Sequence, residues 1–334
     1  MTIAHGYAAH HASGQWQPFE FELPTLGSAD VEIEVDACGI CHSDMSMLDN
    51  AWGITQYPFV GGHEVIGRVA AMGDAVPGLN VGDRVGLGWY CRSCMHCNQC
   101  IGGDHNLCPT VEGTITHQMG GFADRVRCHW GWATKIPEAL DPAKCGPLLC
   151  GGVTVFNPLV QNSVSPTAKV GIVGIGGLGH LAVMFANAWG CEVTAISRSR
   201  AKEAEAREMG AHHFVATGEK GALEAVASKF DLIINTTDAE LAWDDYVATL
   251  APKGILHTVG AAPKVEATVF PMITGQKSFS ASPVGSIATT RTMLEFAARH
   301  RINPITESFP MGEINEAFDK LRNGSPRYRL VLTR

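Results

Sequence analysis

Three glycines, Gly174, Gly176 and Gly179, form a G-x-G-x-x-G pattern between an apolar segment and a helical one. The segment Val170–Val173 predicts a buried strand, and the residues from about Leu178 onward predict a helix. In this context the first glycine permits a tight turn, the second lets a pyrophosphate approach the backbone, and the third lets the helix pack on the strand. The pattern therefore predicts a dinucleotide-binding turn. The alternative is a glycine-rich packing turn, which does not require the flanking strand and helix.

Short apolar segments and helical segments alternate around this turn. Strands are predicted at Val170–Val173, Glu192–Ile196, Phe214–Val215, Asp231–Asn235 and Ile255–Val259. The helical stretches Leu178–Trp189 and Ala201–Met209 are each followed by a glycine, Gly190 or Gly210, at the position that commonly ends a helix. Strand–helix alternation predicts an α/β domain: a doubly wound parallel sheet of the Rossmann type with helices on both faces.

The chain before about Pro147 is rich in short strands and loops. Val31, Ile33 and Val35 alternate with acidic residues, which predicts a strand buried on one face. Further strands are predicted at Val65–Ala71, Asp83–Leu87 and Gly121–Arg127. We expect an antiparallel, barrel-like domain there. After about Ser280 the pattern is irregular and ends in the strand Arg329–Leu332, so the tail is expected to return to this domain.

The predicted division is therefore residues 1–151 with 285–334 for the β-rich domain, and residues 152–284 for the inserted parallel-sheet domain. A length of 334 residues agrees with about two domains. The 25 basic and 33 acidic residues leave a net charge of −8, which argues against a nucleic-acid partner. With 46% hydrophobic and 17% charged residues the chain can build large cores and is not disordered. Residues 1–17 contain no Lys or Arg and no long apolar run, so we expect no secretory signal. The most apolar long stretch, residues 170–190, has the length of a membrane span, but its clustered glycines suit a strand, a turn and a helix better. We therefore expect no membrane span and a cytoplasmic location.

Five of the eleven cysteines lie within 18 residues, between positions 91 and 108. Cys94, Cys97, Cys100 and Cys108 have the spacing of a zinc site, and four thiolates close a tetrahedral site completely. We therefore predict a structural zinc ion. Cys91 stands three residues before Cys94, which is also a metal-like spacing, so the set of four ligands could instead begin one cysteine earlier, at Cys91. Reduced thiols without metal are the remaining alternative.

A second group of possible metal ligands is spread along the chain. It consists of Cys41-His42-Ser43-Asp44 and Gly62-His63-Glu64. Spacing alone does not name a further ligand, and Cys150 is one candidate.

The residues after the strand Glu192–Ile196 indicate which dinucleotide is bound. Sites that use NAD place an acidic residue about 20 residues after the glycine turn. Here Ser197 stands 23 residues after Gly174, and the following positions supply hydroxyls and cations: Arg198, Ser199, Arg200 and Lys202. These groups suit a 2′-phosphate, so we predict NADP(H). A solvated basic helix start is the alternative, although cations at a helix N-terminus oppose the helix dipole.

Five motifs follow one another along the chain: Cys38-Gly39-Ile40-Cys41-His42-Ser43-Asp44, Gly62-His63-Glu64, the four-cysteine pattern, Leu149-Cys150-Gly151-Gly152-Val153-Thr154 and Gly174-Ile175-Gly176-Gly177-Leu178-Gly179. Together they resemble the zinc-dependent medium-chain alcohol dehydrogenases, most closely the cinnamyl-alcohol-dehydrogenase-like NADP(H) subgroup. The resemblance covers essentially the whole chain. It implies that the β-rich domain is a GroES-like catalytic domain into which the Rossmann domain is inserted.

The resemblance also implies roles for individual residues. Cys41, His63 and Cys150 would hold a catalytic zinc, and Glu64 would lie behind the metal as a transient ligand. Asp44 would orient His63 by accepting a hydrogen bond from its other ring nitrogen. With the four-cysteine site this makes two zinc ions per subunit. The implied chemistry is hydride transfer between NADP(H) and a zinc-polarised aldehyde or alcohol.

Ser43 would hydrogen-bond to the substrate oxygen and begin the proton path. Many relatives carry a relay histidine three positions later, where this chain has Ser46. His42 matches a position that usually meets the cofactor pyrophosphate, so it is a poor substitute. We therefore expect proton transfer to depend less on a group that titrates near neutral pH.

The remaining positions carried over by resemblance concern the cofactor and the substrate. The cofactor-binding positions are His42, Thr154, Gly174, Gly176, Gly177, Leu178, Gly179, Ser197, Arg198, Ser199, Arg200, Lys202, Val259, Gly260, Ser282, Val284 and Arg327. The substrate pocket would be lined by Trp52, Trp89, Val284 and Ser286. Two indoles suit an aromatic or medium-chain aldehyde better than a polyol, although Trp52 could instead be an ordinary packing residue.

The sequence thus predicts an NADP(H)-dependent zinc alcohol dehydrogenase that acts mainly as an aldehyde reductase. A polyol dehydrogenase of the same fold is one alternative; it would favour NAD, and Ser197 and Cys150 argue against it. A zinc-ribbon interaction protein is the non-enzyme alternative. We expect a homodimer, because relatives pair two subunits through the edge strand of the parallel sheet.

Overall fold

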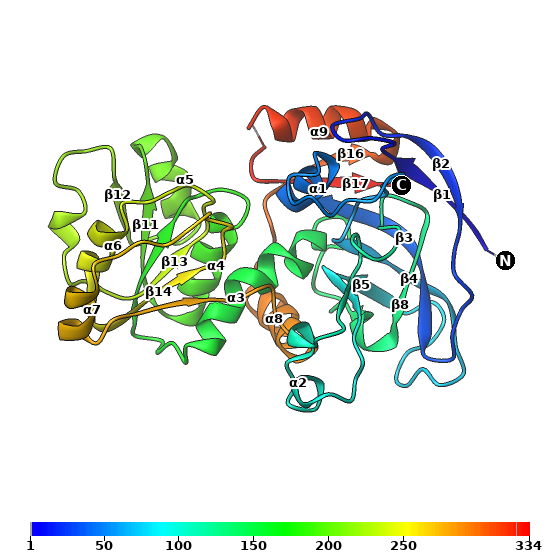
Figure 1. The fold of residues 1–334 in the computed structure, drawn as a ribbon, viewed down its shortest axis with the longest axis horizontal. Coiled ribbons are helices and arrows are strands. Elements are labelled where there is room, and N and C mark those ends of the chain that lie inside the picture. Colours follow the sequence, from blue (N-terminus) through cyan, green and yellow to red (C-terminus); the bar gives the residue numbers. More distant parts are fainter. Residues whose placement is uncertain (1, 325) are drawn as a thin grey trace. The chain divides into compact units, whose positions relative to one another are not determined.

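The computed structural model describes residues 2–324 and 326–334 and divides into two compact units. Unit 1 extends to Cys150 and resumes with Gly285–Arg334; unit 2 is Gly151–Val284. The sequence predicted divisions after residues 151 and 284. Figure 1 shows the sheet and helices of each unit.

Unit 1 is built on a seven-stranded sheet with the order β16-β17-β3-β4-β5-β9, in which β8 also pairs with β3. All neighbours are antiparallel except β16 and β17, and two hairpins, β1–β2 and β6–β7, complete the unit. The strands are β1 Ile3–Ala8, β2 Gln17–Glu22, β3 Asp30–Ile40, β4 Val65–Met72, β5 Arg84–Leu87, β6 Tyr90–Arg92, β7 Glu112–Gly113, β8 Arg125–His129, β9 Thr134–Lys135, β16 Thr306–Pro310 and β17 Arg329–Thr333.

The central strand β3 departs from strict alternation at two acidic residues, Asp30 and Glu32, which are buried. Val31, Ile33 and Val35 are buried as predicted, but Glu32 is only 4% exposed. Its carboxylate accepts hydrogen bonds from Arg125 Nη1 at 2.7 Å and Arg127 Nε at 2.9 Å, both on the neighbouring strand β8. Because paired cations offset the cost of burying the charge, both faces of β3 are covered at this position.

None of the helices of unit 1 was predicted from the sequence. They are α1 His42–Leu48, α2 Asn98–Ile101, α8 Ile287–His300 and α9 Ile314–Arg322, with 3-10 turns at His105–Leu107, Trp130–Trp132, Gly146–Leu149 and Met311–Glu313. The expectation of an irregular tail after Ser280 is therefore wrong. Ser286 caps the start of helix α8, where its hydroxyl accepts the Thr289 N–H, and the helix buries Met293, Leu294 and Ala297 on one face. Its run of threonines weakens the helical pattern in the sequence, whereas packing of that face stabilises it.

Unit 2 has a six-stranded parallel sheet with the order β12-β11-β10-β13-β14-β15. The strands are β10 Lys169–Val173, β11 Glu192–Ser197, β12 His213–Ala216, β13 Phe230–Asn235, β14 Leu250–Thr258 and β15 Ser278–Ala281. The helices are α3 Gly151–Gln161, α4 Gly179–Trp189, α5 Glu203–Glu208, α6 Trp243–Thr249 and α7 Val269–Gly275, with 3-10 turns at Arg200–Lys202 and Glu224–Val226. The predicted doubly wound topology is confirmed, and β15 adds a strand that was not predicted.

The glycines of the turn after β10 are required by geometry. Gly174 has φ +85°, a conformation that favours glycine, and a Cβ on Gly179 would lie 1.7 Å from the Gly174 carbonyl oxygen. Helix α4 begins at Gly179 and ends at Trp189, and Gly190, whose φ is +106°, caps it. The strand, the turn and the start of the helix therefore follow from the sequence as predicted.

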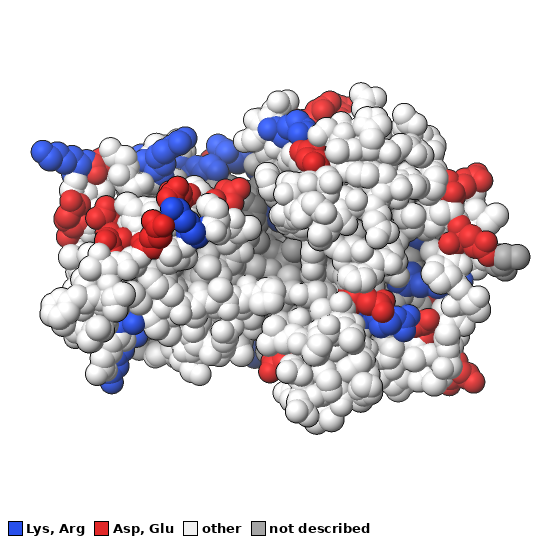
Figure 2. Space-filling view, in the orientation of Figure 1, with Lys and Arg blue, Asp and Glu red and all other residues white. Residues whose placement is uncertain are grey.

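In the residues that the structure describes, no helix is long and apolar enough to cross a membrane. Figure 2 shows acidic side chains among the basic ones on the face in view, as a net charge of −8 leads one to expect.

Candidate active site

Four potential metal ligands from separate parts of unit 1 lie within reach of one ion. Cys41 lies between β3 and α1, His63 and Glu64 precede β4, and Cys150 follows the 3-10 turn Gly146–Leu149. All four side chains are buried, and their ligand atoms lie within 4.8 Å of one another. The structure thus brings Cys150, which spacing alone left open, to the side chains of Cys41 and His63.

The distances and unpaired atoms of this cluster fit a zinc ion. Tetrahedral zinc with Zn–S bonds of about 2.3 Å places two thiolate sulfurs about 3.8 Å apart. The sulfurs of Cys41 and Cys150 are 3.9 Å apart. Within the described residues, the buried atoms His63 Nε2 and Glu64 Oε2 have no hydrogen-bond partner. Two sulfurs, one unpaired imidazole nitrogen and one nearby carboxylate form a donor set that suits zinc.

Asp44 holds this arrangement in place from the first turn of α1. One carboxylate oxygen accepts the N–H of Cys41 at 2.9 Å. The other accepts the N–H of Gly62 at 2.9 Å and lies 3.0 Å from His63 Nδ1. A carboxylate accepts hydrogen bonds, so Nδ1 carries the proton and Nε2 presents its lone pair to the site.

Arg329, on β17, is a site residue that the sequence analysis missed. Its guanidinium donates through Nη2 to Glu64 Oε1 and to the Ile40 carbonyl oxygen. The side chain is 5% exposed although it carries a charge. The only sequence signal is an arginine at the start of an apolar strand, and that signal does not name a partner.

Charges in the cluster favour loss of a thiol proton. The hydrogen bond with Cys150 holds the pKa of Cys41 well below its usual range, and the Arg329 and His63 charges add to this effect against the opposing effect of burial. The same hydrogen bond and burial raise the pKa of Cys150. Burial raises the pKa of Glu64 to about 7, while Arg329 favours its charged form. The cluster thus favours a thiolate within this pair, and the thiolate is the form that binds metal.

Two tryptophans form an aromatic wall beside His63. The Trp89 indole meets the His63 ring edge to face, with centroids 4.8 Å apart. Trp52 packs on Trp89 in a similar way at 6.0 Å and is itself 42% exposed. Ser43 is half-buried on the same first turn of α1 as Asp44. Ser286, predicted to line the substrate pocket, has its hydroxyl engaged as the N-cap of α8.

The four predicted ligands of the structural site also converge. The sulfurs of Cys94, Cys97, Cys100 and Cys108 lie within 4.8 Å of one another, and those of Cys94 and Cys100 are 4.0 Å apart. Cys91 is separate: its thiol donates to the Glu112 carbonyl oxygen, and burial raises its pKa to about 12. The structure therefore supports the original quartet and not the quartet shifted to Cys91.

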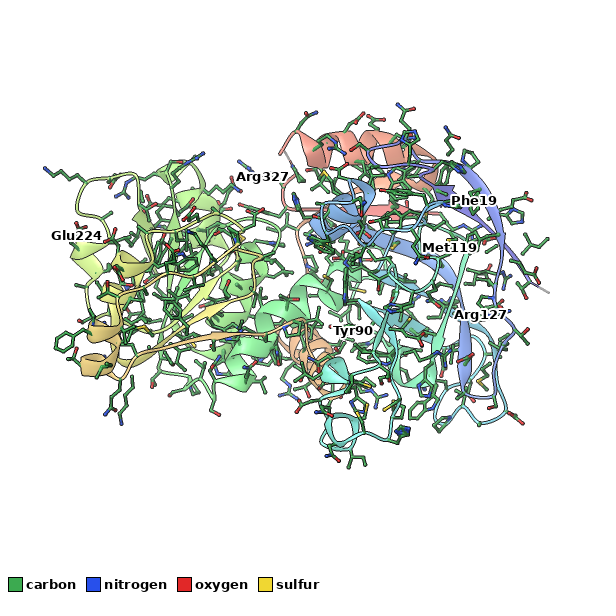
Figure 3. All side chains as sticks on the ribbon, viewed as in Figure 1. Phe19, Tyr90, Met119, Arg127, Glu224 and Arg327 are labelled. Atoms are coloured by element: carbon green, nitrogen blue, oxygen red, sulfur yellow. The ribbon has the colours of Figure 1, made fainter. Side chains whose placement is uncertain are left out.

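The segment with the structural site is anchored to the rest of unit 1 by polar and aromatic contacts. Arg92 Nη2 donates to Asp30 at 2.7 Å, and Trp132 Nε1 donates to Ser93 at 3.3 Å. Tyr90, labelled in Figure 3, packs against Trp132 with ring centroids 5.5 Å apart.

In unit 2 most of the predicted cofactor residues lie at the carboxyl ends of β10, β11 and β14. The Thr236 hydroxyl lies 2.8 Å from the carbonyl oxygens of both Val173 and Gly174, which holds the glycine turn. Lys202 Nζ donates to the Ile175 carbonyl oxygen of the same turn. Val259 and Gly260 follow β14, and a Cβ on Gly260 would lie 2.0 Å from the Thr237 carbonyl oxygen.

The basic residues after β11 differ in how they are paired. Arg200 bonds to Glu219 through two nitrogens at 2.7 and 2.9 Å and to Glu203 at 2.8 Å. Ser197 is half-buried at the end of β11, whereas Arg198 and Ser199 are exposed. Arg198 and Ser199 are thus better placed than Arg200 to meet an external anion.

The remaining predicted positions are scattered over both units. His42 is exposed on α1, and Thr154 is buried on α3. Arg327 lies on the segment between α9 and β17, where its N–H donates to Glu307 (Figure 3). Ser282 and Val284 follow β15.

Known proteins match this chain over nearly its whole length. Residues 27–138 match the alcohol dehydrogenase GroES-like domain, and residues 177–299 match the zinc-binding dehydrogenase family. Aldehyde reductase AdhA of Synechocystis sp. is 52% identical over 328 residues, 98% of each chain. The chain belongs to the zinc-dependent medium-chain alcohol dehydrogenases. This alcohol dehydrogenase also resembles the probable cinnamyl alcohol dehydrogenase 8A of Oryza sativa subsp. japonica, at 40% identity over 99% of this chain and 95% of the relative.

Solved structures agree with the assignment of this alcohol dehydrogenase to the cinnamyl-alcohol-dehydrogenase-like subgroup. A cinnamyl alcohol dehydrogenase of Sorghum bicolor has a TM-score of 0.94 and 37% identity over 99% of this chain and 98% of that one. A Helicobacter pylori enzyme of the same type, complexed with NADP(H), has a TM-score of 0.90 and 29% identity over the same shares. The predicted fold class and the predicted alcohol dehydrogenase and aldehyde reductase activity are confirmed, and the zinc-ribbon alternative is set aside.

Proposed function

We propose that this alcohol dehydrogenase uses NADP(H) and acts mainly as a reductase of aromatic or medium-chain aldehydes. The observation that carries the cofactor proposal is the end of β11, where exposed Arg198 and Ser199 follow Ser197 and no acidic residue stands at positions 197–200. The Helicobacter pylori relative solved with NADP(H) supports this assignment. A polyol dehydrogenase that uses NAD is the alternative.

The residues proposed to hold zinc are those that fit it by geometry. Cys41, His63 and Cys150 would hold the catalytic ion with Glu64 behind it, and the cysteine quartet at 94, 97, 100 and 108 would hold a structural ion. A zinc ion bound at the first site would act as a Lewis acid toward the substrate oxygen, and a bound nicotinamide would supply the hydride. The protein contributes orientation and electrostatics.

The chain's own groups then have separate tasks. Asp44 keeps the proton of His63 on Nδ1, so that Nε2 stays a ligand. The Ser43 hydroxyl would donate to the substrate oxygen and begin the proton path, without an imidazole at Ser46. Trp89 and Trp52 would bind the apolar part of the substrate and keep water from it, which favours aromatic aldehydes over polyols.

We also propose a homodimer that pairs through unit 2. Strand β15 lies at the edge of the parallel sheet and offers unpaired backbone groups. The preceding helix α7 exposes Val269, Phe270 and Ile273 at 63, 72 and 66%. An apolar surface beside an open sheet edge suits a second copy of the chain. Light scattering at micromolar concentration would give a dimer mass; a monomer mass would contradict this proposal.

A cytoplasmic location is proposed as well. All eleven cysteines of the chain are free thiols in the structure, and the proposed zinc ligands require thiols to stay reduced.

Steady-state reduction of cinnamaldehyde, benzaldehyde and a C6 aldehyde, with NADPH and NADH in parallel, tests the function. We expect kcat/KM with NADPH to be at least about tenfold higher, which corresponds to roughly 1.4 kcal/mol. We expect kcat/KM for the reduction of aromatic aldehydes to be higher than kcat/KM for the oxidation of polyols. Equal use of NADH would contradict the cofactor proposal, and preference for polyols would contradict the substrate class.

A further inference from the structure

A buried histidine of unit 2 connects three polar side chains near the sheet edge. His257, on β14, is fully buried. Its Nδ1 lies 2.8 Å from Ser280 Oγ and 3.2 Å from Asn162 Nδ2, and its Nε2 lies 2.9 Å from Ser282 Oγ. Three partners around one buried ring form a connected polar network, and such networks rigidify the groups they join.

The partners determine where the ring proton lies. An amide nitrogen only donates, and Asn162 Nδ2 already donates to the Pro158 carbonyl oxygen at 2.8 Å. Its 3.2 Å contact with His257 therefore directs a second N–H at Nδ1, and the Ser280 hydroxyl, 2.8 Å from the same nitrogen, then donates to it as well, so we assign Nδ1 as the acceptor. Nε2 must then carry the proton of the neutral ring and donate it to Ser282 Oγ. Burial keeps the ring neutral, because it lowers the pKa of His257 to about 4.

The sheet register explains how one ring reaches both serines. His257 lies directly opposite Ser280 in the parallel pair β14–β15. Ser282 follows two residues later and so projects to the same face as Ser280. Because Ser282 Oγ accepts from His257, its own hydrogen points away from the ring and is available to an acceptor on a ligand.

Ser282 stands where the second half of a dinucleotide is expected. A dinucleotide lies across the carboxyl ends of the strands at the point where the strand order reverses, here between β10 and β13. The 2′-phosphate residues lie at the end of β11, on one side of that point. The nicotinamide half therefore extends over the ends of β13, β14 and β15.

We propose that His257 is a positioning residue that orients the Ser282 hydroxyl as a donor to an acceptor oxygen of the nicotinamide half, either its carboxamide or its ribose. This inference rests on the proposed NADP(H) function. His257 does not itself touch the cofactor; it acts through Ser282.

Binding titrations separate this role from a structural one. We would measure the Kd of NADPH, and of 2′,5′-ADP, which lacks the nicotinamide half, for wild-type enzyme and for Ser282→Ala, His257→Leu, His257→Gln and the His257→Leu/Ser282→Ala double variant. Each of Ser282→Ala and His257→Leu is expected to weaken NADPH binding about five- to tenfold, the effect of one hydrogen bond, and to leave 2′,5′-ADP binding within about twofold. His257→Gln, whose amide can replace the Nε2 donor, should recover most of the affinity.

The double variant decides between the two roles. If His257 acts through Ser282, the double variant binds NADPH no more weakly than Ser282→Ala alone. Ser280→Ala, which removes the other hydroxyl on the same ring, is the matched control and should stay within about twofold of wild type. The inference would be overturned if the losses of NADPH affinity in the two single variants added up in the double variant. It would also be overturned if His257→Leu weakened 2′,5′-ADP binding as much as NADPH binding.

A failure of the proposed function would look different. Wild-type enzyme would then bind neither NADPH nor 2′,5′-ADP. The same comparison, made with NADH and ADP-ribose, would still show whether His257 and Ser282 act together on the nicotinamide half.

Discussion

The Nδ1 atom of His63 lies 3.0 Å from Oδ1 of Asp44, and both side chains are completely buried. This contact directs the other ring nitrogen of His63 toward the two cysteine sulfurs. The strength of the zinc site should therefore depend on a residue that does not touch the metal.

We predict that Asp44→Asn lowers the affinity of the catalytic site for zinc about 10- to 100-fold, because the neutral amide orients His63 less firmly and makes it a weaker ligand. Competition with a chelator would measure the loss. Asp49→Asn, at the end of the same helix and paired with Arg322, is the control and should leave zinc affinity unchanged. Equal zinc affinity in the Asp44 variant and wild type would contradict the proposed orientation.

Arg329→Met should destabilise the protein by about 3–5 kcal/mol, because it leaves Glu64 as an unpaired charge in a buried site. Urea unfolding of the zinc-loaded enzyme would measure this. Adding Glu64→Gln to Arg329→Met should recover part of the loss, since the uncompensated charge is removed. Lys320→Met breaks the half-exposed pair with Glu307 and should cost less than about 1 kcal/mol. If Arg329→Met and Lys320→Met lowered the free energy of unfolding by similar amounts, the ion pair with Arg329 would not be what stabilises the buried Glu64 carboxylate.

Cys100→Ser and Cys91→Ser form a matched pair of changes at buried thiols of the same segment. Cys100→Ser should reduce the zinc content by one ion per chain and lower the melting temperature, because a closed four-thiolate site contributes directly to folding. Cys91→Ser should keep the full zinc content. Loss of zinc from the Cys91 variant would mean that the quartet is shifted.

Ser197→Asp should reverse the cofactor preference toward NADH by at least about tenfold in kcat/KM, since a carboxylate repels a 2′-phosphate and binds a 2′-hydroxyl. Arg198→Gln should weaken NADPH use more than Arg200→Gln does, because Arg200 is already paired with Glu203 and Glu219. Steady-state kinetics with both cofactors would test both statements. The reverse order of the two arginine variants would place the phosphate nearer to Arg200.

His257 should contribute to acid sensitivity. Its pKa is about 4 in the folded protein and about 6.5 when unfolded, so the unfolded chain binds more protons between these values. Stability is therefore unaffected by this group above about pH 6.5 and falls as the pH drops from 6.5 to 4, by up to about 3 kcal/mol. Urea unfolding at several pH values should show a shallower decline between pH 6.5 and 4 for His257→Leu than for wild type. Parallel declines would contradict this assignment.

Several features of this protein could be predicted from the sequence because they depend on neighbouring residues. The glycine turn at Gly174–Gly179 requires backbone freedom at set positions, and Gly190 ends its helix through a positive φ. The cysteine quartet lies within 15 residues, so its spacing alone suffices to suggest a closed metal site. The absence of an acidic residue just after β11, which indicates the cofactor, can likewise be read from neighbouring residues.

Other features were decided only by the tertiary structure. Arg329 and Glu64 are 265 residues apart in the chain, and their contact exists because β17 pairs with β3 beside the start of β4. The burial of Glu32, the packing of Trp89 on His63 and the network around His257 likewise join segments from different elements. Helix α8 is stabilised by packing against a core that its own residues do not reveal. Local conformation follows from short-range sterics and hydrogen bonding, whereas buried charge pairs and aromatic contacts arise only when the sheets close and bring distant residues out of water.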